Sequence, residues 1–304
     1  MTTALATLDK LETRLAPSTV DEMILAFLAS TRSENTFAAY RTDLKCWLAW
    51  ATSVGLDPAH AGRWGRSVME LYRRELEARG MAPSTVARRL STVSSFYRYG
   101  QAEGVFERNP ASLMARPRLD GESPRLGLSA DEAKRLLEVC GAPQERALVS
   151  LLLFNALRVS EAVGADVEDL SAERGHRTLR IKGKGQVRKG VLIPLPPIVS
   201  SAIDDHLAGR EQGPLFVNLS GDRMSRFGVF ARLRRLARAA DIAKTISPHS
   251  LRHTAVTLAL DAGVPLRDVQ ILARHKSSTT TLKYDRHRQD LDRHASYSLA
   301  AYLA

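Results

Sequence analysis

The first third of the chain has the spacing of amphipathic helices. From Val20 onward, apolar residues recur every three or four positions, which is the pattern of a helix with one buried face. A second such run begins after Ser33, a residue type common at helix starts, and another opens at Pro83. The pattern predicts a small all-α domain of four or five short helices over residues 18 to 106.

This periodicity is lost over residues 107 to 124, where proline, glycine and charged residues gather, and such a composition is typical of a linker. A second domain is expected over residues 125 to 304. Ser129 followed by Glu132 has the pattern of a capping box, so a helix should begin there. A nearly continuous apolar run from Ala147 to Val163 predicts the core helix of this domain.

Two short runs after that helix have the composition of strands. Residues 178 to 181 and 190 to 195 are rich in aliphatic and β-branched side chains, and a Gly183-Lys184-Gly185 turn separates them. An antiparallel hairpin is predicted, and the rest of the domain is expected to be helical. The predicted fold is therefore mostly α, in two domains, with a small antiparallel β-sheet in the second.

Composition narrows the choice of partner and compartment. The formal net charge of +11 and the pI near 10.0 indicate a polyanionic partner, and nucleic acid is favoured over an acidic membrane surface. Cys46 and Cys140 lie in no zinc-binding or disulfide pattern, which fits a reducing cytoplasm. No apolar run approaches the roughly 18 residues that a membrane span needs. We expect a soluble, cytoplasmic protein with no membrane partner.

Five short motifs follow one another in the second domain. They are Leu157-Arg158-Val159-Ser160-Glu161, Gly183-Lys184-Gly185, His249-Ser250-Leu251-Arg252-His253, His275 after Ile271-Leu272-Ala273-Arg274, and Tyr284. Their order, and the nine-residue step from His275 to Tyr284, resemble the tyrosine recombinase (phage integrase) family. Each motif alone is weak, but the ordered set is specific.

The resemblance implies both a fold and an activity. The helical domain would be a SAM-like domain that binds the core DNA site, and with the catalytic domain it would form a C-shaped clamp. The enzyme would cleave and rejoin DNA at specific sites through a 3′-phosphotyrosyl intermediate, without a metal ion, ATP or another cofactor. Its partners would be double-stranded DNA recombination sites, on which a tetramer assembles through the C-terminal tail. Such an enzyme would act in the cytoplasm of a bacterial cell.

Elementary chemistry supports part of this reading. Attack on a phosphodiester builds negative charge on its oxygens, so fixed cationic donors are needed where no metal ligands are present. Arg158 and Arg252 each offer a planar fork that can bind two phosphate oxygens. His249 lies three residues before Arg252, so both side chains share one helix face. With an ordinary pKa of about 6.5, His249 can accept the proton of a phenol near neutrality.

The remaining roles follow from the resemblance. Tyr284 would be the nucleophile, Lys184 the general acid for the departing 5′ oxygen, and His275 a hydrogen-bonding partner of the phosphate. Glu161 and His253 would support the residues that touch the phosphate, although Glu161 could equally form a plain surface ion pair with Arg158.

Simpler readings compete with these roles. Taken singly, Arg158 could cap a helix C-terminus, Lys184 could be a solvated turn residue and Tyr284 an ordinary half-buried aromatic residue. His249 and His253 have the spacing of a zinc pair. His275 is the one obvious third ligand in the sequence, however, and the nearby Arg252 would repel the metal ion.

Two departures from the family pattern bear on the biological role. Arg274 stands where the family usually has glycine, and Asn155-Ala156 replaces the more usual Thr-Gly. These changes favour an integrase of a phage or other mobile element over a housekeeping Xer-type chromosome-dimer resolvase. A catalytically silent DNA-binding protein and a type IB topoisomerase-like enzyme remain as alternatives.

DNA contacts are expected from two basic helices, although such helix faces are often merely solvated. The candidates are Arg88, Arg89, Arg226, Arg232, Arg234 and Arg235. Only about 18 residues precede the first predicted helix, so we expect a Xer-like member without an arm-binding domain, acting on short core sites. Beyond Tyr284, apolar positions such as Leu291, Ala295 and Leu299 predict a tail that packs on its own subunit or on a neighbouring one.

Overall fold

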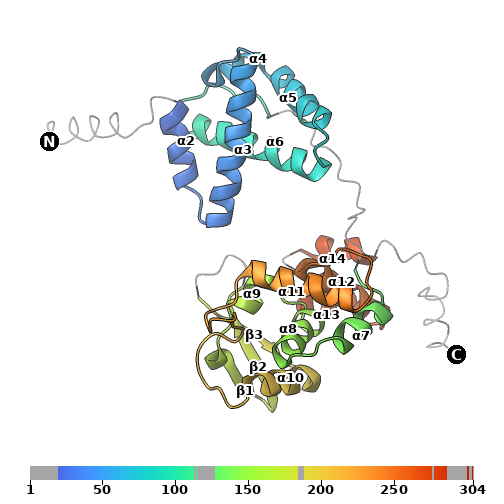
Figure 1. Cartoon of the computed structure of the whole chain (residues 1–304). Helices are drawn as coiled ribbons and strands as arrows, with labels where there is room; N and C mark the ends of the chain where they lie inside the picture. Colours follow the sequence, from blue (N-terminus) through green and yellow to red (C-terminus); the bar gives the residue numbers. More distant parts are fainter. Residues whose placement is uncertain are drawn as a thin grey trace. The chain divides into compact units, whose positions relative to one another are not determined.

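The computed structural model of the chain describes residues 20–112, 114, 127–183, 188–275, 277–285, 300 and 303, without the side chains of residues 62, 64, 279 and 283 to 285. The chain divides into two compact units, Met1–Glu122 and Ser123–Ala304 (Figure 1). Within the described residues, no helix combines the length and the apolar character that crossing a membrane requires.

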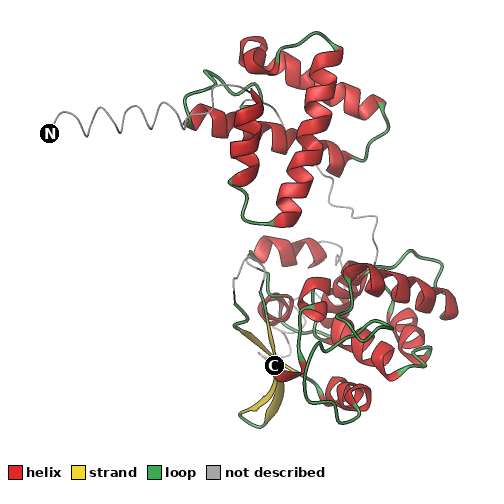
Figure 2. Ribbon diagram, turned by 60° about the vertical axis from the view of Figure 1, so that its left-hand side comes forward, coloured by secondary structure: helices red, strands yellow, loops and turns green. Residues whose placement is uncertain are grey.

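All regular secondary structure in the described part of the first unit is helical, as predicted (Figure 2). Its elements are α2 (Val20–Ala29), α3 (Glu34–Ser53), the 3-10 helix η1 (Pro58–His60), α4 (Ala61–Trp64), α5 (Arg66–Ala78) and α6 (Pro83–Ala102). The longest two, α3 and α6, pack against each other. Each has 20 residues, so they are longer than the short helices that the sequence indicated.

An aromatic cluster forms the centre of the first unit. Trp47 and Tyr72 meet edge to face with ring centroids 5.0 Å apart, and Trp50 packs beside both. Two of its polar groups are paired: Trp47 Nε1 donates to the Tyr97 hydroxyl at 3.2 Å, and that hydroxyl donates to the Pro58 carbonyl at 2.8 Å. Large buried rings contribute strongly to a small core.

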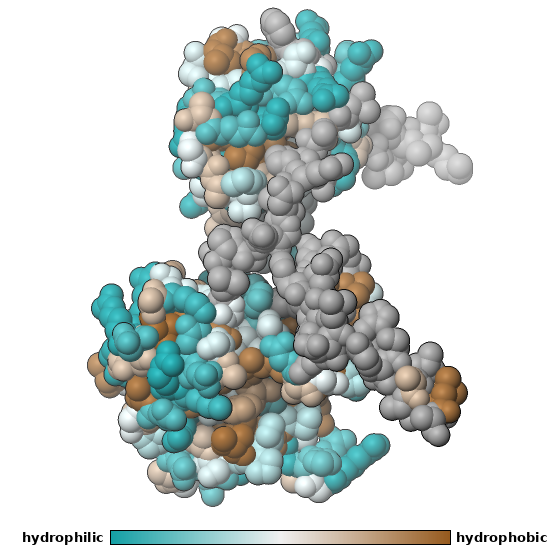
Figure 3. All heavy atoms as spheres, turned by 90° about the vertical axis from the view of Figure 1, so that its right-hand side faces the viewer, coloured by the Kyte–Doolittle hydropathy of each residue, from teal (hydrophilic) through white to brown (hydrophobic). Residues whose placement is uncertain are grey.

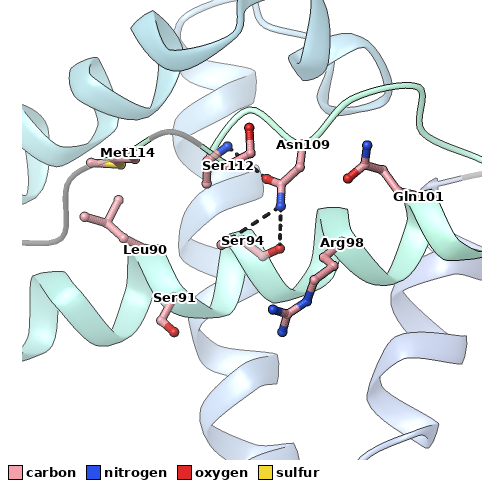
Figure 4. Close-up of a pocket in the computed structure, with 9 residues that line it drawn as sticks. Leu90, Ser91, Ser94, Arg98, Gln101, Asn109, Ser112 and Met114 are labelled. Atoms are coloured by element: carbon pink, nitrogen blue, oxygen red, sulfur yellow. Dashed lines mark hydrogen bonds between the residues drawn. The ribbon is translucent and has the colours of Figure 1, made fainter.

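The segment that follows α6 still belongs to the first unit's core. Phe106 and Ala111 are buried in it. Asn109 Nδ2 donates to the Ser94 carbonyl at 3.0 Å, and Asn109 Oδ1 accepts from the Ala111 amide at 2.9 Å (Figure 4). The packed part of the unit therefore extends past residue 106, because the loss of helical periodicity marks the end of a helix and not the end of packing.

The second unit combines helices with one small sheet. Its elements are α7 (Ala130–Glu138), α8 (Pro143–Phe154), α9 (Val159–Val163), the 3-10 helix η2 (Val167–Asp169), β1 (Leu170–Glu173), β2 (His176–Ile181), β3 (Val191–Pro194), α10 (Pro197–Leu207), α11 (Arg226–Ala239), α12 (Pro248–Asp261), α13 (Leu266–Ala273) and α14 (Ser278–Asp285). The core lies around α8, which packs against α10 on one side and α12 on another (Figure 1).

The three strands form an antiparallel sheet in the order β1-β2-β3. The predicted hairpin is confirmed as β2 and β3, with Leu179 opposite Ile193. β1 was not predicted; it pairs with β2 so that Leu170 lies opposite Leu179. The strand is only four residues long and its burial pattern shows no buried residue, so it carries no alternation that would identify it.

The predicted continuous helix from Ala147 to Val163 is wrong, because the chain breaks it after Phe154. Ala156 has a left-handed backbone with φ 47°. Arg158 is extended and is the N-cap of α9, where its amide donates to Glu161 Oε2 at 2.9 Å. Ala156 and Leu157 are apolar and fully buried, so hydrophobic patterning does not distinguish this turn from a continuing helix.

The capping box at the start of α7 is confirmed, and it provides a stability test. Ser129 Oγ accepts from the Glu132 amide at 3.2 Å, and Glu132 Oε2 accepts from the Ser129 amide at 2.8 Å. Ser129→Ala should destabilise the second unit by about 1 kcal/mol. For a domain of this size, that lowers the melting temperature by roughly 2–4 °C, measured by circular dichroism.

Ser33→Ala is the matched control. Ser33 is the N-cap of α3 but its side chain makes no capping hydrogen bond, so the first unit's stability should change by less than about 0.5 kcal/mol. Equal losses in the two variants would show that the Ser129 hydroxyl bond contributes nothing.

Candidate functional site

The N-terminus of α12 positions two of the predicted site residues. The Ser247 hydroxyl accepts from the Ser250 amide at 3.2 Å, and Pro248 occupies the first turn. His249 therefore lies in the first turn of α12, and Arg252 lies three residues further along the same face. The dipole of a helix favours an anion at its N-terminal end.

Arg252 is almost completely buried, with 4% of its surface exposed. Its Nη1 donates to the Ala156 carbonyl in the turn between α8 and α9, and its Nη2 donates to the Ala273 carbonyl at the end of α13. A buried guanidinium is tolerated only when such dipoles hold it. These two bonds therefore fix the Arg252 side chain against two separate segments of the unit.

Arg158 lies beside the same turn. Its Nη1 donates to Glu161 Oε1 at 2.7 Å, and its Nη2 reaches the Arg274 carbonyl at 3.4 Å. As the N-cap of α9, Arg158 does not cap a helix C-terminus. Glu161 is 3% exposed and the Arg158 side chain 28%, so a buried carboxylate holds a partly exposed guanidinium in this pair. A buried carboxylate with fixed partners restricts the guanidinium orientation.

Arg274 also joins the site, although the motif that contains it was assigned no role for this residue. Its guanidinium donates to Glu161 Oε2 at 3.0 Å and to the Ala156 carbonyl at 2.9 Å. Burial raises the pKa of Glu161, but the charges of Arg274 and Arg158 and the Arg158 amide outweigh it, so the pKa is below its ordinary value. Glu161 is thus ionised near neutrality. The departure from glycine at position 274 was the available signal of this contact.

His275 follows Arg274 and links α13 to α14. Its Nδ1 lies 2.9 Å from Thr281 Oγ1. Burial, and then the positive charges of Arg252, Arg158, Arg274 and His249, lower the pKa of His275 to about 4. The imidazole is therefore neutral at physiological pH, and it can act as a hydrogen-bonding group but not as a cation.

The predicted nucleophile is placed by its backbone. Tyr284 lies in α14, three residues beyond the buried Thr281, and α14 packs on α12 and α13. Its side chain lies outside the described residues, as do Lys184 and the tail from residue 286 to 299. The structure therefore describes the helix that carries Tyr284 but not the position of its hydroxyl.

Three of the six predicted catalytic residues are linked through the end of α13. Arg252 donates to the Ala273 carbonyl, Arg158 donates to the next carbonyl, that of Arg274, and His275 follows Arg274 in the chain. His249 lies in the first turn of α12, on the same helix face as Arg252. His253 lies one turn further along α12, with Nδ1 3.3 Å from Thr257 Oγ1.

A zinc site is the alternative for the histidines of α12. Among the residues that the structure describes, no group of three or more His, Cys, Asp or Glu side chains could hold a metal ion. The zinc reading of His249 and His253 thus has no complete ligand set within that part of the chain.

In the first unit, the predicted DNA-binding arginines of α6 are engaged with Asp43 of α3. Asp43 is fully buried and accepts from Arg88 Nη1, and from Thr92 Oγ1 at 2.9 Å. Arg89 Nε lies 3.7 Å from the other carboxylate oxygen, and only 12% of its side chain is exposed. Arg88 keeps a half-exposed side chain and is the better placed of the two for a phosphate.

The same helix also borders a polar cavity. Ser91, Ser94 and Arg98 of α6 line it together with Asn109 and Ser112, and its volume is about 360 Å³ (Figure 4). The hydroxyls and the Arg98 guanidinium therefore face an open hollow, while the apolar side of α6 packs into the core.

In the second unit, α11 presents most of its arginines to solvent. Arg226 and Arg234 are exposed. Arg235 pairs with Glu145 of α8, and Arg232 Nη1 lies 2.9 Å from Met224 Sδ. On the face shown in Figure 3, hydrophilic side chains cover much of each unit, and hydrophobic ones form separate patches. Arg226, Arg234 and Arg235 are therefore the α11 candidates with exposed side chains.

Two family models match the chain. The model of the phage integrase family matches residues 127–290, and that of the phage integrase N-terminal SAM-like domain matches residues 25–104. The chain is 31% identical to a tyrosine recombinase of Synechococcus elongatus over 324 residues, which cover all of both proteins. It is 34% identical to the tyrosine recombinase XerC of Pelobacter propionicus over 261 residues, 83% of this chain and 84% of that protein.

The fold is also found among solved structures. The Tn1549 transposon integrase in complex with transposon right end DNA superposes with a TM-score of 0.73 at 18% identity, over 92% of this chain and 99% of that one. This likeness concerns the fold, whereas the sequence matches cover both units. From the matched models and the full-length relative, we conclude that the chain belongs to the phage integrase family of tyrosine recombinases, which carry out site-specific DNA recombination by cutting and rejoining strands.

Proposed function

We propose that this chain cleaves and rejoins double-stranded DNA through a 3′-phosphotyrosyl bond to Tyr284, and that it needs neither a metal ion nor ATP. The observation that carries the proposal is that Arg158 and Arg252 donate to the consecutive carbonyls of Arg274 and Ala273, at the end of α13. The next residue after Arg274 is His275, so these contacts support a common site for the two guanidinium groups and this imidazole.

The two arginines would bind the phosphate whose bond is broken. Negative charge grows on its nonbridging oxygens as the nucleophile attacks, and preorganised guanidinium donors stabilise that charge without reorganisation. The main-chain carbonyls that hold Arg252, and the carboxylate that holds Arg158, supply this preorganisation. The dipole of α12 adds a favourable potential at its N-terminus.

The proton transfers would fall to His249 and Lys184. The Tyr284 oxygen attacks phosphorus and loses its proton, which His249 can accept, while the 5′ oxygen leaves as a hydroxyl after taking a proton from Lys184. The phosphotyrosyl ester replaces one phosphodiester with another of similar energy. Religation by a 5′ hydroxyl reverses the step, so no nucleotide hydrolysis is required.

The covalent intermediate gives the direct test of this proposal. A half-site is first selected by letting the protein capture duplexes from a randomised pool. Each duplex carries a nick, so that a short fragment dissociates after cleavage and the covalent adduct cannot be religated. In EDTA and without nucleotide, wild type should form the adduct, and Tyr284→Phe should form none because it lacks the attacking oxygen. Denaturing gel electrophoresis measures the covalent product.

Tyr297→Phe serves as the matched control, since it removes a tyrosine hydroxyl from the same end of the chain, and it should leave adduct formation intact. Loss of the adduct in EDTA would overturn metal independence. A catalytically silent DNA-binding protein would shift the DNA on a native gel but give no adduct. A topoisomerase-like enzyme would relax supercoiled DNA without requiring paired sites.

We also propose that the C-terminal tail docks on a neighbouring subunit and couples the active sites of a tetramer on DNA. The proposal is supported by the apolar positions after Tyr284 and by Leu303, which exposes 73% of its surface. Apolar side chains that are exposed in one subunit can be buried against another, and this burial stabilises subunit association.

Deletion of residues 290 to 304 should therefore impair assembly and strand exchange more than DNA binding. The dissociation constant for one half-site should change by less than about threefold, which is well below the tenfold change that corresponds to about 1.4 kcal/mol. Cooperative binding to the second half-site should be lost. Gel shifts across a protein titration measure both. Unchanged cooperativity in the truncated protein would contradict tail docking.

Two biological roles are compatible with this chemistry. The departures at Arg274 and at Asn155-Ala156 favour a phage or other mobile-element integrase. The similarity to XerC proteins favours a chromosome-dimer resolvase. We propose the mobile-element role. Sequencing the DNA that is covalently trapped on the protein in its native host distinguishes the two roles. Adducts at the ends of a mobile element support our proposal, whereas adducts at one chromosomal site favour chromosome-dimer resolution.

The neutral state of His275 leads to a pH prediction. Its pKa is about 4 in the folded chain and about 6.5 when unfolded. Between these values the unfolded state binds more protons, so stability rises with pH there. The contribution is full above pH 6.5 and is lost as pH falls towards 4. The melting temperature of wild type should therefore drop between pH 6.5 and pH 5, and that of His275→Gln should drop less.

His176→Gln, which replaces an exposed histidine of β2, is the control and should keep the wild-type slope. Burial also lowers the pKa of His206, so part of the slope will remain in every variant. Identical pH profiles for wild type and His275→Gln would show that His275 titrates normally in the folded protein.

A further inference from the structure

Arg274 ends α13 in the left-handed backbone conformation, with φ 51° and ψ 44°, directly before His275. A residue with a Cβ adopts this conformation at a cost, whereas glycine adopts it freely. Glycine would therefore suit the backbone better at this position. Any advantage that arginine brings must come from its side chain.

The Arg274 guanidinium reaches back to the turn between α8 and α9. Its Nη1 donates to the Asn155 carbonyl at 3.2 Å, and its Nη2 donates to the Ala156 carbonyl at 2.9 Å. The Arg274 carbonyl accepts from Arg158 Nη2 at 3.4 Å. The side chain is 14% exposed, so water competes little for these bonds. They join the end of α13 to the turn that presents Arg158.

Arg274 also shares the charge of Glu161. Glu161 Oε2 accepts from Arg274 Nη2 at 3.0 Å, while Oε1 accepts from Arg158 Nη1 at 2.7 Å. With a single guanidinium partner, this buried carboxylate would largely cancel the charge of Arg158. With two guanidinium partners, the group carries one positive charge in excess. At a low local dielectric constant, this excess charge interacts strongly with a nearby phosphate.

We propose that Arg274 is a positioning residue for DNA cleavage, which shares the Glu161 carboxylate and holds the carbonyls of the α8–α9 turn so that Arg158 stays oriented and positively charged towards the phosphate. The inference rests on the proposed recombinase function and deepens it. Arg274 need not touch the DNA, because its effect passes through Glu161 and Arg158.

A neighbouring group gives independent support. The charge of Arg274 is one of those that hold His275 neutral, after burial and the charges of Arg252 and Arg158. Removing Arg274 should therefore raise the pKa of His275 towards its ordinary value, which nuclear magnetic resonance of the imidazole protons can follow. A side chain that only filled space would not move this pKa.

The first experiment compares charge at constant position. Full-length Arg274→Lys, Arg274→Gln and Arg274→Gly are tested for adduct formation under single-turnover conditions on the selected nicked half-site, with binding measured separately. Arg274→Gln and Arg274→Gly should slow adduct formation by about 10- to 100-fold, the usual range for a residue that supports a ligand-binding group. Arg274→Lys should lose less, and half-site affinity should change by less than about threefold, well under one decade.

Arg267→Gln is the matched control, because Arg267 is an exposed arginine on the same helix. It should react at the wild-type rate. Equal losses in Arg274→Lys and Arg274→Gln, or a wild-type rate in Arg274→Gln, would overturn the inference. If the glycine variant did not fold, the lysine and glutamine pair would still decide the question.

The second experiment tests whether Glu161 transmits the effect. In wild type, Glu161→Gln should slow the reaction, because Arg158 loses its buried partner. In Arg274→Gly, the same change should speed it by at least about fivefold, because the carboxylate left with Arg158 alone is removed; such a reversal of sign is a coupling that independent sites do not show. If the two losses simply multiply, Arg274 has a purely structural role and the proposal fails.

Both experiments separate this inference from the proposed function. If wild type forms no Tyr284-dependent adduct, the recombinase proposal is wrong, and the inference on Arg274 falls with it. If wild type forms the adduct while every Arg274 variant reacts at the wild-type rate, the recombinase proposal stands and the role of Arg274 is refuted.

Discussion

The carbonyl of Ala156 accepts hydrogen bonds from two guanidinium groups, and the candidate site depends on this arrangement. Arg252 and Arg274 both donate to it. In a continuing helix this carbonyl would accept from an amide four residues later. The left-handed backbone at Ala156 ends that ladder and frees the carbonyl for side chains. Three arginines that would otherwise repel one another are thus held by fixed dipoles and by Glu161.

The surrounding core makes this arrangement rigid. The helix before the turn, α8, is buried along most of its length and packs against α10 and α12. Asn155 Nδ2 donates to the Pro194 carbonyl at 2.8 Å, which ties the turn to β3 and therefore to the hairpin. Groups that must hold a reacting atom in place work best when their own supports are packed in this way.

Much of this fold could be predicted from the sequence, because it depends on local signals. Helical spacing, the Ser129 capping box and the glycine-flanked turn are each encoded within a few residues. The motifs also predicted one site for Arg158, Arg252 and His275, and in the structure the two arginines donate to the carbonyls of Arg274 and Ala273, directly before His275. The break at Ala156 was missed because its residues are apolar and buried, like those of a helix.

Contacts that span the sequence could not be predicted in this way. Arg274 and Glu161 are separated by 113 positions, and Arg88 and Asp43 by 45. A pattern within one element shows that such a side chain is polar, but it does not show which distant carboxylate receives it. Arg89 was predicted to face DNA for this reason, whereas most of its side chain is buried beside Asp43.

The aromatic cluster of the first unit has a consequence for spectroscopy. The chain has three tryptophans, Trp47, Trp50 and Trp64, and all lie within Met1–Glu122. Indole emission therefore monitors the unit that does not contain the candidate catalytic residues. Unfolding of the catalytic unit could pass unseen by fluorescence, so a probe of helix content or an introduced indole is needed to report on it.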